Sequence, residues 1–214
     1  GQGRATKTIV IAGASASMGA RPRMTSIDLE EFKVGVANER IARAGLSEQC
    51  QSLAFDARRL ASGQLPDALA RTFDTVFVDA PCSGSGTLRR HPEIAWSLEE
   101  GAVAAGGSLP SLQLEILTAA SARVAPGGLL LYSTCSNLAS ENEGVVSRFL
   151  ASVAGAGFSA EPADAAAAVV PALSADARAL LSGMLSEGGF LRSAGTSEGD
   201  VLLDGHFLAR LRRR

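Results

Sequence analysis

Two cysteines and one aspartate lie just beyond apolar runs that read as buried strands. The run Thr75–Val78 leads into Asp79-Ala-Pro-Cys82, and a second run, from Leu129, ends in Ser-Thr-Cys135. Proline and glycine residues stop the first strand directly after Asp79, so a carboxylate and a thiol collect at its carboxyl end. Because ligands bind at that end of the strands in open α/β sheets, we expect the three side chains to share one sheet edge.

Cys135 is a candidate nucleophile because the backbone turns at the end of its strand and the side chain can face a cleft. Only a thiolate attacks, so this residue needs a local positive field or a proton acceptor on the substrate. The alternative for a lone cysteine is a small buried hydrophobic residue, and the polar neighbours Ser133–Asn137 count against it. Cys50 lacks such neighbours, and we interpret it as structural. Cys82, beside a proline that restricts the turn, could be a second catalytic group.

A basic and aromatic stretch follows this turn. Arg89, Arg90 and His91 suit contacts with nucleic-acid phosphates, and an ordinary solvated loop is an equally good interpretation. Trp96 could stack on a base, although packing inside the protein is the commoner use of a single tryptophan. A second basic group, Arg210 with residues 212–214, closes the chain.

The bulk composition is that of an ordinary globular protein. The 214 residues carry a formal net charge of -2, which gives no global signal for nucleic acid but leaves room for local basic patches. Three cysteines without CxxC spacing argue against a disulfide framework and a zinc site, so we expect a reduced, cytoplasmic protein without a metal. The sequence contains neither an apolar run of membrane-spanning length nor a signal-peptide pattern, which predicts a soluble protein.

The segment before residue 20 allows two interpretations. A basic, glycine-containing loop, Gly1–Thr8, runs directly into an apolar stretch. In the favoured interpretation, Thr8–Ala16 is a helix after a phosphate- or carboxylate-binding loop, and the first strand of the sheet lies before residue 1. In the other, Thr8–Ala12 is a strand and Gly13–Gly19 a dinucleotide-binding loop. The strand from Met24 then begins too soon for the crossover that parallel strands require.

Acidic residues end the next two predicted strands. Asp28 closes the strand that starts at Met24, where nucleotide-binding folds use a carboxylate to accept two hydrogen bonds from a ribose diol. Asp28 could also cap the helix expected over residues 30–44, which Gly45 terminates. Asp56 ends the strand expected over residues 51–56, and a helix cap and a ligand contact are equally good interpretations of it.

The rest of the chain alternates strands with helices. We expect a short helix over 66–71, a strand over 73–79, a helix over 108–124 and a strand over 129–133. The run Ser140–Glu143 fits a capping box that opens a helix to about residue 154, with its carboxylates at the positive helix end. A helix over 174–186 and a closing hairpin or edge strand, with its turn at Asp204-Gly205, follow. This order predicts a single α/β domain of Rossmann type over residues 1–214.

These motifs resemble those of the RNA cytosine-5 methyltransferases, the family of the bacterial Sun-type 16S rRNA enzymes and the eukaryotic nucleolar and NSUN-type proteins. The resemblance is carried by residues 79–96, by Leu112–Leu117, and by Tyr132–Ser136 with Glu141-Asn142. The closing segment Asp204–Arg210 is similar to the Asp-Gly-Phe-Phe strand of the family. The resemblance covers nearly the whole chain and implies a Rossmann-like sheet of the S-adenosylmethionine-dependent methyltransferases.

The resemblance implies a role for each matching residue. Cys135 would attack the base, Cys82 would help to release the product, and Asp79 would contact both the methyl donor and the target base. Asp28 would bind the ribose of S-adenosylmethionine, and Asp56 its adenine side. The loop for the rest of the cofactor departs from the commoner Ala-Pro-Gly-Gly-Lys form of the family, and consists of Gly1, Gln2, Gly3, Arg4, Ala5, Thr6 and Lys7.

The implied activity is methyl transfer from S-adenosylmethionine to C5 of a cytosine in RNA, through a covalent bond between Cys135 and C6. We expect rRNA, above all 16S rRNA, as the substrate and tRNA as the alternative, with RNA contacts from Arg89, Arg90 and His91. We also expect a monomer that binds no membrane. Because the chain starts within the cofactor loop, we expect it to be the C-terminal catalytic part of a longer protein. The competing interpretations are an NAD(P)-dependent Rossmann oxidoreductase and an inactive, methyltransferase-like RNA-binding scaffold.

Overall fold

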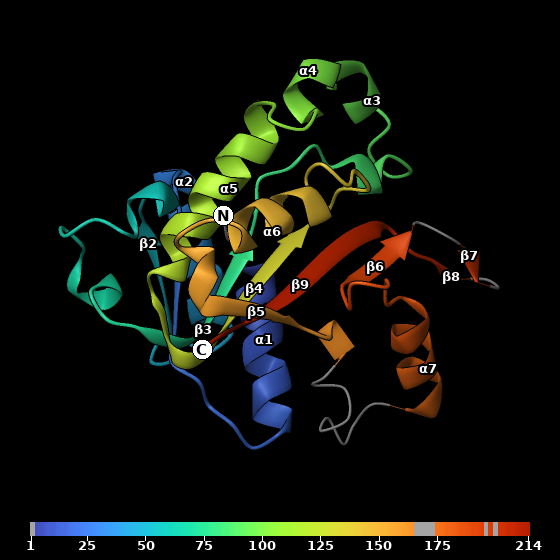
Figure 1. Ribbon diagram of the computed structural model, residues 1–214. Helices are drawn as coiled ribbons and strands as arrows, with labels where there is room; N and C mark the ends of the chain where they lie inside the picture. The colour runs from blue at the N-terminus through green and yellow to red at the C-terminus, as the bar shows by residue number, and fades with distance from the viewer. Residues whose placement is uncertain (1–2, 165–173, 195–196, 199–200) are drawn as a thin grey trace. The chain divides into compact units, whose positions relative to one another are not determined.

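The computed structural model describes residues 3–164, 174–194, 197–198 and 201–214 (Figure 1). Backbone contacts divide the chain into two compact units, unit 1 (Gly1–Arg71) and unit 2 (Thr72–Arg214), and we describe each by itself. None of the helices in the described residues combines the length and apolar character that a membrane span requires. The expectation that residues 1–214 form one catalytic domain stays a prediction.

Unit 1 is a two-stranded parallel sheet with two helices. β1 and β2 pair in register from Met24↔Cys50 to Asp28↔Ala54, and helix α2 connects them, as a parallel pair requires. Ala37 and Ile41 of α2 share a buried apolar cluster with Cys50 of β2. The bounds are Thr6–Ser17 for α1, Met24–Asp28 for β1, Glu31–Arg43 for α2 and Cys50–Ala54 for β2, followed by 3₁₀ turns at Ala57–Arg59 and Asp67–Leu69.

Helix α1 decides between the two interpretations of the first segment. The helical interpretation is confirmed, and the interpretation as a strand with a dinucleotide-binding loop is wrong. The buried positions of α1 are Thr8 and Ala12, which are four residues apart and therefore lie on one helix face. The strand expected over 51–56 ends at Ala54, so Asp56 lies beyond it, and the helix expected over 66–71 is only a 3₁₀ turn.

Unit 2 is built on a mixed sheet of five strands. β3 (Phe73–Asp79) and β4 (Val124–Thr134) are parallel, and their register pairs Asp79 with Ser133. β9 (Gly205–Arg213) lies antiparallel to β4. β5 (Phe158–Glu161) and β6 (Leu191–Ala194) pair with successive parts of β9, while β7 (Ser197–Glu198) and β8 (Val201–Leu202) pair only with each other.

The prediction of a closing hairpin or edge strand is wrong. β9 lies between β4 and the two strands β5 and β6, so it is central in the sheet (Figure 1). Phe207, Ala209 and Leu211 are fully buried and alternate with more exposed residues, as expected for a strand with one buried face. The arginines of its other face, Arg210 and Arg212, form ion pairs with Glu161 of β5. Because polar residues occupy one face of β9, its local sequence resembles that of an edge strand although the strand is central in the sheet.

One helix of unit 2, α5, packs on the two parallel strands of the sheet. α5 packs against β3, β4 and α6 (Figure 1). It ends at Ser121 rather than near residue 124, because β4 already begins at Val124. The helix bounds are Ile94–Ser97 for α3, Glu100–Val103 for α4, Ser108–Ser121 for α5, Glu143–Leu150 for α6 and Ala175–Gly183 for α7.

Candidate active site

The carboxyl ends of β3 and β4 bring the two predicted catalytic cysteines together. The Sγ atoms of Cys82 and Cys135 are 3.2 Å apart, and both residues are reduced, partly exposed thiols. The residues are 53 positions apart in the sequence, so the parallel pairing of the two strands creates this contact. Unit 2 thus contains two thiols in hydrogen-bonding contact at one sheet edge.

Backbone hydrogen bonds extend the strand pairing into both cysteine loops. The amide of Ala80 donates to the carbonyl of Ser133 over 2.9 Å, and the amide of Gly86 donates to the carbonyl of Cys135 over 3.0 Å. Asp79 is the last residue of β3 and is half-buried. The structure therefore assembles all three predicted catalytic residues at the carboxyl ends of two adjacent strands.

The two thiols influence each other's ionisation. The hydrogen bond with Cys135, the burial of the side chain and the charge of Cys135 together raise the pKa of Cys82 well above its ordinary range. Cys82 therefore keeps its proton at neutral pH and can donate it in a hydrogen bond to the sulfur of Cys135. A thiol that keeps its proton is a poor nucleophile, so only one cysteine of the pair is suited to attack at a time.

Glu141 binds both cysteine loops, and the sequence analysis missed it as a site residue. Its side chain is 0% exposed. Ser83, the residue after Cys82, donates its amide to Oε1 over 2.9 Å and its hydroxyl to Oε2 over 2.5 Å. Ser136, the residue after Cys135, donates its hydroxyl to Oε2 over 2.5 Å. Nε2 of Gln113, in α5, donates to Oε1 over 2.9 Å.

The prediction of a capping box over Ser140–Glu143 is wrong. The residue before α6 is Asn142, whose side chain forms no cap, and the hydroxyl of Ser140 donates instead to the carbonyl of Val103. The Ser-x-x-Glu spacing drew attention to Glu143, whereas the buried carboxylate is Glu141. The one sequence signal for this position was the presence of Glu141-Asn142 among the residues that carry the family resemblance.

Two glycines allow three backbone segments to meet beside the thiols. A Cβ atom on Gly86 would lie 2.1 Å from the carbonyl oxygen of Gly205, and a Cβ atom on Gly205 would lie 2.0 Å from Oδ1 of Asn137. No larger residue fits at either position without displacing its neighbours. The contact ties the 3₁₀ turn Ser85–Thr87, the loop after Cys135 and the start of β9 together.

The predicted RNA-binding arginines contact an aspartate of the same unit. Nε of Arg90 donates to Oδ2 of Asp204 over 2.6 Å, and Nη2 of Arg89 lies 3.6 Å from Oδ1. The hydrogen bond from Arg90 holds the pKa of Asp204 below its ordinary value. The arginine side chains are still 51% and 53% exposed, so a phosphate can also reach them. His91 is exposed and contacts Glu93.

Trp96 lies in α3 and is 92% exposed. The interpretation of this residue as internal packing is therefore wrong. Both faces of an exposed indole can accept a stacked base, and such stacking is a common means of binding single-stranded nucleic acid.

The predicted cofactor loop is bonded within unit 1. Gly1 and Gln2 lie outside the described residues. The amide of Gly3 donates to Oδ2 of Asp28 over 3.0 Å. Nη1 of Arg40, in α2, donates to the carbonyl of Arg4 over 2.7 Å, which holds the loop on the second helix of the unit.

The same loop ends in a left-handed turn that leads into α1. Ala5 is buried and has a φ of 59°, a conformation that costs a non-glycine residue about 1 kcal/mol or more. Thr6, the first residue of α1, accepts a hydrogen bond from Arg40 over 3.2 Å. Lys7 is exposed in the first turn of the helix.

Asp28 and Asp56 both have local partners. Oδ1 of Asp28 accepts from the amide of Glu30 over 3.2 Å, but the residue before α2 is Glu30, so Asp28 is not the helix cap. Asp56 does cap the 3₁₀ turn after it, because Oδ1 accepts from the amide of Arg58 over 3.0 Å. Hydrogen bonds from the Arg58 side chain lower the pKa of Asp56. A ligand contact of either aspartate stays a prediction.

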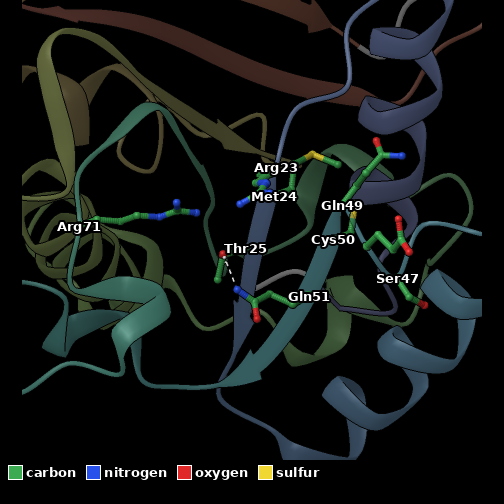
Figure 2. A pocket seen from close by; sticks show the side chains of 9 residues that line it. Arg23, Met24, Thr25, Ser47, Gln49, Cys50, Gln51 and Arg71 are labelled. Atoms are coloured by element: carbon green, nitrogen blue, oxygen red, sulfur yellow. Dashed lines mark hydrogen bonds between the residues drawn. The ribbon is translucent and has the colours of Figure 1, made fainter.

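A pocket of about 420 Å³ lies in unit 1, and none of the predicted site residues lines it (Figure 2). Its lining includes Met24 and Cys50, the first residues of β1 and β2, and therefore marks the amino ends of these strands. Asp28 lies at the opposite, carboxyl end of β1. Burial raises the pKa of the Cys50 thiol, which agrees with a structural role for this cysteine. In the described part of the chain, we find no group of three potential metal-ligating side chains.

Sequence comparisons find relatives of this chain among the methyltransferases. A sequence profile described as 16S rRNA methyltransferase RsmB/F matches residues 4–177. Ribosomal RNA small subunit methyltransferase B of Sodalis glossinidius is 35% identical over 131 residues, which cover 60% of this chain and 28% of the relative. The protein of the same name from Erwinia tasmaniensis is 40% identical over 120 residues, which cover 55% of this chain and 27% of the relative.

A solved structure, NSun6 from Pyrococcus horikoshii with SFG, has the same fold. It superimposes with a TM-score of 0.68 and 23% sequence identity, and the match covers 97% of this chain and 45% of the NSun6 chain. The chain therefore has the Rossmann-like α/β fold of this structure, and the family profile that it matches is that of a methyltransferase.

Proposed function

The chain belongs to the 16S rRNA methyltransferase RsmB/F family, and from this premise we propose that it transfers a methyl group from S-adenosylmethionine to C5 of a cytosine in RNA, with 16S rRNA as the substrate. The observation that carries the proposal is the pair of thiols 3.2 Å apart at the carboxyl ends of β3 and β4. One thiol suffices to attack a base, and a second thiol in contact with it supplies a proton acceptor for the release of the product.

Cys135 is the proposed nucleophile. C5 of cytosine is too weak a nucleophile to accept a methyl group directly, so the thiolate of Cys135 adds to C6 and gives C5 the electron density of an enamine. When bound, S-adenosylmethionine supplies the electrophilic methyl group. The base must leave its stack to reach the thiol, which favours RNA loops and single-stranded segments.

Asp79 is the proposed partner of the base edge. It ends β3, directly before the loop that carries Cys82. A carboxylate at this position can accept a hydrogen bond from the exocyclic amine of cytosine and orient C6 toward Cys135. As the thiolate adds to C6, negative charge builds on the N3 side of the ring, and the hydrogen bond from the exocyclic amine to Asp79 keeps that edge of the base in place.

Cys82 is the proposed base of the release step. Two of the causes that raise its pKa come from Cys135, namely its hydrogen bond and its charge. Both causes vanish once Cys135 is bonded to C6. Cys82 can then ionise, accept the proton from C5, and so return the electron pair that expels Cys135.

The residues near the start of the chain suit the cofactor. A carboxylate oxygen can accept two hydrogen bonds, so Asp28 keeps capacity for a ribose diol beside its bonds to Gly3 and Glu30. Leu29 and Phe32, which follow it, are 67% and 75% exposed and offer apolar surface for a purine ring. We assign the ribose to Asp28, the adenine side to Asp56, and the methionine part to Gly1–Lys7.

The RNA contacts are assigned to the segment after Cys82. Arg89, Arg90 and His91 are exposed and offer donors to phosphates, although Asp204 competes for the two arginines. Trp96 is assigned to a stacked base of the bound strand. The same loop thus carries Cys82 at one end and the RNA-binding residues at the other.

The test compares two cysteine variants with the unchanged chain, using a 16S rRNA transcript and S-adenosylmethionine with a labelled methyl group. Cys135→Ala removes the nucleophile and abolishes labelling of the RNA. Cys82→Ala leaves the attack intact but slows release, so a protein–RNA adduct accumulates on a denaturing gel. Labelling of C5 by the Cys135→Ala protein would contradict the proposal.

A further inference from the structure

We propose that Glu141 is a positioning residue that holds the thiols of Cys82 and Cys135 at their working separation. This inference rests on the proposed function, because it names a further residue of the same reaction. Glu141 touches neither sulfur. It acts through the residue that follows each cysteine, Ser83 in one loop and Ser136 in the other.

The loop of Cys82 is held on both sides of the cysteine. Before it, the carbonyl of Pro81 accepts from Nε2 of Gln113 over 2.8 Å. After it, Ser83 donates both its amide and its hydroxyl to Glu141. Since Gln113 also donates to Oε1 of Glu141, these two side chains are hydrogen-bonded to each other and to the residues on both sides of Cys82.

The loop of Cys135 is held in the same way by Glu141 and the residue after it. The hydroxyl of Thr134 donates to Oδ1 of Asn142 over 2.6 Å, and Nδ2 of Asn142 donates to the carbonyl of Ser136 over 2.8 Å. The hydroxyl of Ser136 donates to Glu141. The backbone on either side of Cys135 is therefore fixed by the adjacent pair Glu141-Asn142.

Glu141 itself is anchored to the sheet. The hydroxyl of Tyr132, in β4, donates to the main-chain carbonyl of Glu141 over 2.6 Å. In the described part of the chain the carboxylate is bonded to hydrogen-bond donors, not to a cation. A fully buried carboxylate without an ion-pair partner is costly to desolvate, so its hydrogen bonds to both cysteine loops point to a use beyond packing.

The chemistry explains why the separation matters. Release requires Cys82 to reach the proton on C5 while Cys135 is bonded to C6 of the same ring. A misplacement of about 1 Å at such a site reduces the rate by up to about a hundredfold. Two loops that are 53 residues apart in sequence need a common anchor to maintain this accuracy, and Glu141 is bonded to both.

The experiment uses Glu141→Gln, which keeps the size of the side chain but replaces one acceptor oxygen by a donor. The matched control is Glu143→Gln, the next carboxylate along the chain, which pairs with Arg192 and forms no bond to Ser83 or Ser136; Arg192 itself also donates to the carbonyl of Asn137. We expect kcat of Glu141→Gln to fall by about tenfold or more, with the KM values for RNA and S-adenosylmethionine changed by less than about threefold. The control keeps the kcat of the unchanged chain.

The second measurement needs no substrate. Diamide adds to one of the two thiols, and the second thiol then attacks that sulfur and displaces the hydrazine, so that two protons and two electrons pass to diamide as the disulfide forms. With diamide in excess the second step limits the rate, which then depends on how closely the sulfurs approach. All variants carry Cys50→Ser, so that only Cys82 and Cys135 can react. The oxidation rate is measured over a pH series: its limiting value at high pH depends on the distance between the sulfurs, and the pH at its midpoint depends on thiol ionisation. We expect Glu141→Gln to lower the limiting rate about tenfold and Glu143→Gln to leave it unchanged.

The two measurements separate the possible failures. A folded Glu141→Gln protein with an unchanged kcat, or with an unchanged limiting oxidation rate, would overturn the positioning role. Absence of methyl transfer in the unchanged chain would overturn the proposed function alone, and the oxidation rates would still decide the role of Glu141. Should Glu141→Gln not fold, Ser83→Ala keeps the carboxylate and one of its bonds to the Cys82 loop. It is then expected to show a smaller fall in both quantities, and no fall in either would overturn the proposal.

Discussion

At the scale of the single residue, a hydrogen bond joins the thiols of Cys82 and Cys135 and changes their ionisation. The hydrogen bond with Cys135, the burial of the side chain and the charge of Cys135 raise the pKa of Cys82, so this thiol keeps its proton. The same contact that makes Cys82 a poor nucleophile disappears when Cys135 is bonded to the substrate. In the proposed reaction, one pair of identical side chains therefore attacks and releases in turn.

This assignment predicts the pH dependence of adduct breakdown. Cys82 must lose its proton to act as a base, so the breakdown rate rises with pH and levels off above the pKa that Cys82 has in the adduct. In Cys82→Ala the rate is low and lacks this rise. The measurement is a single-turnover reaction quenched at intervals and resolved on a denaturing gel. A breakdown rate of the unchanged protein that does not vary with pH would contradict the prediction.

Trp96 gives a second prediction for a single residue. Because the indole is 92% exposed, Trp96→Ala leaves the melting temperature unchanged. If a base stacks on the ring, the same change weakens RNA binding by about tenfold. Trp96→Phe keeps an aromatic face and retains most of the affinity, as fluorescence anisotropy with a labelled single-stranded RNA would show. Equal affinities of the alanine variant and the unchanged protein would exclude the stacking contact.

At the scale of the elements, the accuracy of the site depends on close contact between three backbone segments. The turn at Ser85–Thr87, the loop after Cys135 and the start of β9 approach one another through Gly86 and Gly205. The amide of Gly86 also donates to the carbonyl of Cys135. The cysteine loops are therefore held against a regular strand, and not only against each other.

Gly86→Ala tests this contact. The added methyl group would lie 2.1 Å from the carbonyl oxygen of Gly205, which belongs to the backbone and cannot rotate away. We expect a loss of about 2–3 kcal/mol in the free energy of unfolding, measured by urea denaturation, together with lower methyl transfer. Gly101→Ala, in α4, is the control, because no heavy atom lies within 4 Å of its added Cβ. Equal urea midpoints for the two variants would show that the turn can move away from β9 at no cost in stability.

At the scale of the whole molecule, residues near the end of the chain complete the sheet of unit 2. β9 pairs with β4, β5 and β6, so strands from three other parts of the chain meet on it. Tyr132 of β4 and Phe207 of β9 pack edge to face with ring centroids 6.3 Å apart. The core of unit 2 therefore forms only when distant segments have come together, which makes its folding dependent on non-local contacts.

Two leucines of β9 test this dependence. Leu211 is fully buried, and Leu211→Ala is expected to cost about 3 kcal/mol in the free energy of unfolding. Leu208 lies on the same strand but is only partly buried, and Leu208→Ala is expected to cost clearly less. Urea denaturation of both variants measures the difference. Similar losses at the two positions would contradict the alternation of buried and exposed residues in β9.

The sequence by itself determined the local features. The strands Met24–Asp28 and Phe73–Asp79 lie where the apolar pattern predicted them, and the missing room for a crossover correctly favoured a helix at α1. The position of each cysteine at the end of a strand followed from the same pattern. These features depend on periodicity and turn residues within a few positions, which a single sequence displays directly.

Only the tertiary structure decided which distant residues meet. Glu141 contacts Ser83 across 58 positions, and Arg90 contacts Asp204 across 114. In the sequence, Glu141 is a carboxylate just before a predicted helix, and Arg90 is an arginine in a loop that could bind phosphate. Neither stretch indicates that their partners are Ser83 and Asp204. Burial and pairing over such separations depend on how strands and loops stack, and that information is absent from any local stretch of sequence. For this reason the two thiols could be predicted, whereas the carboxylate that holds both of their loops could not.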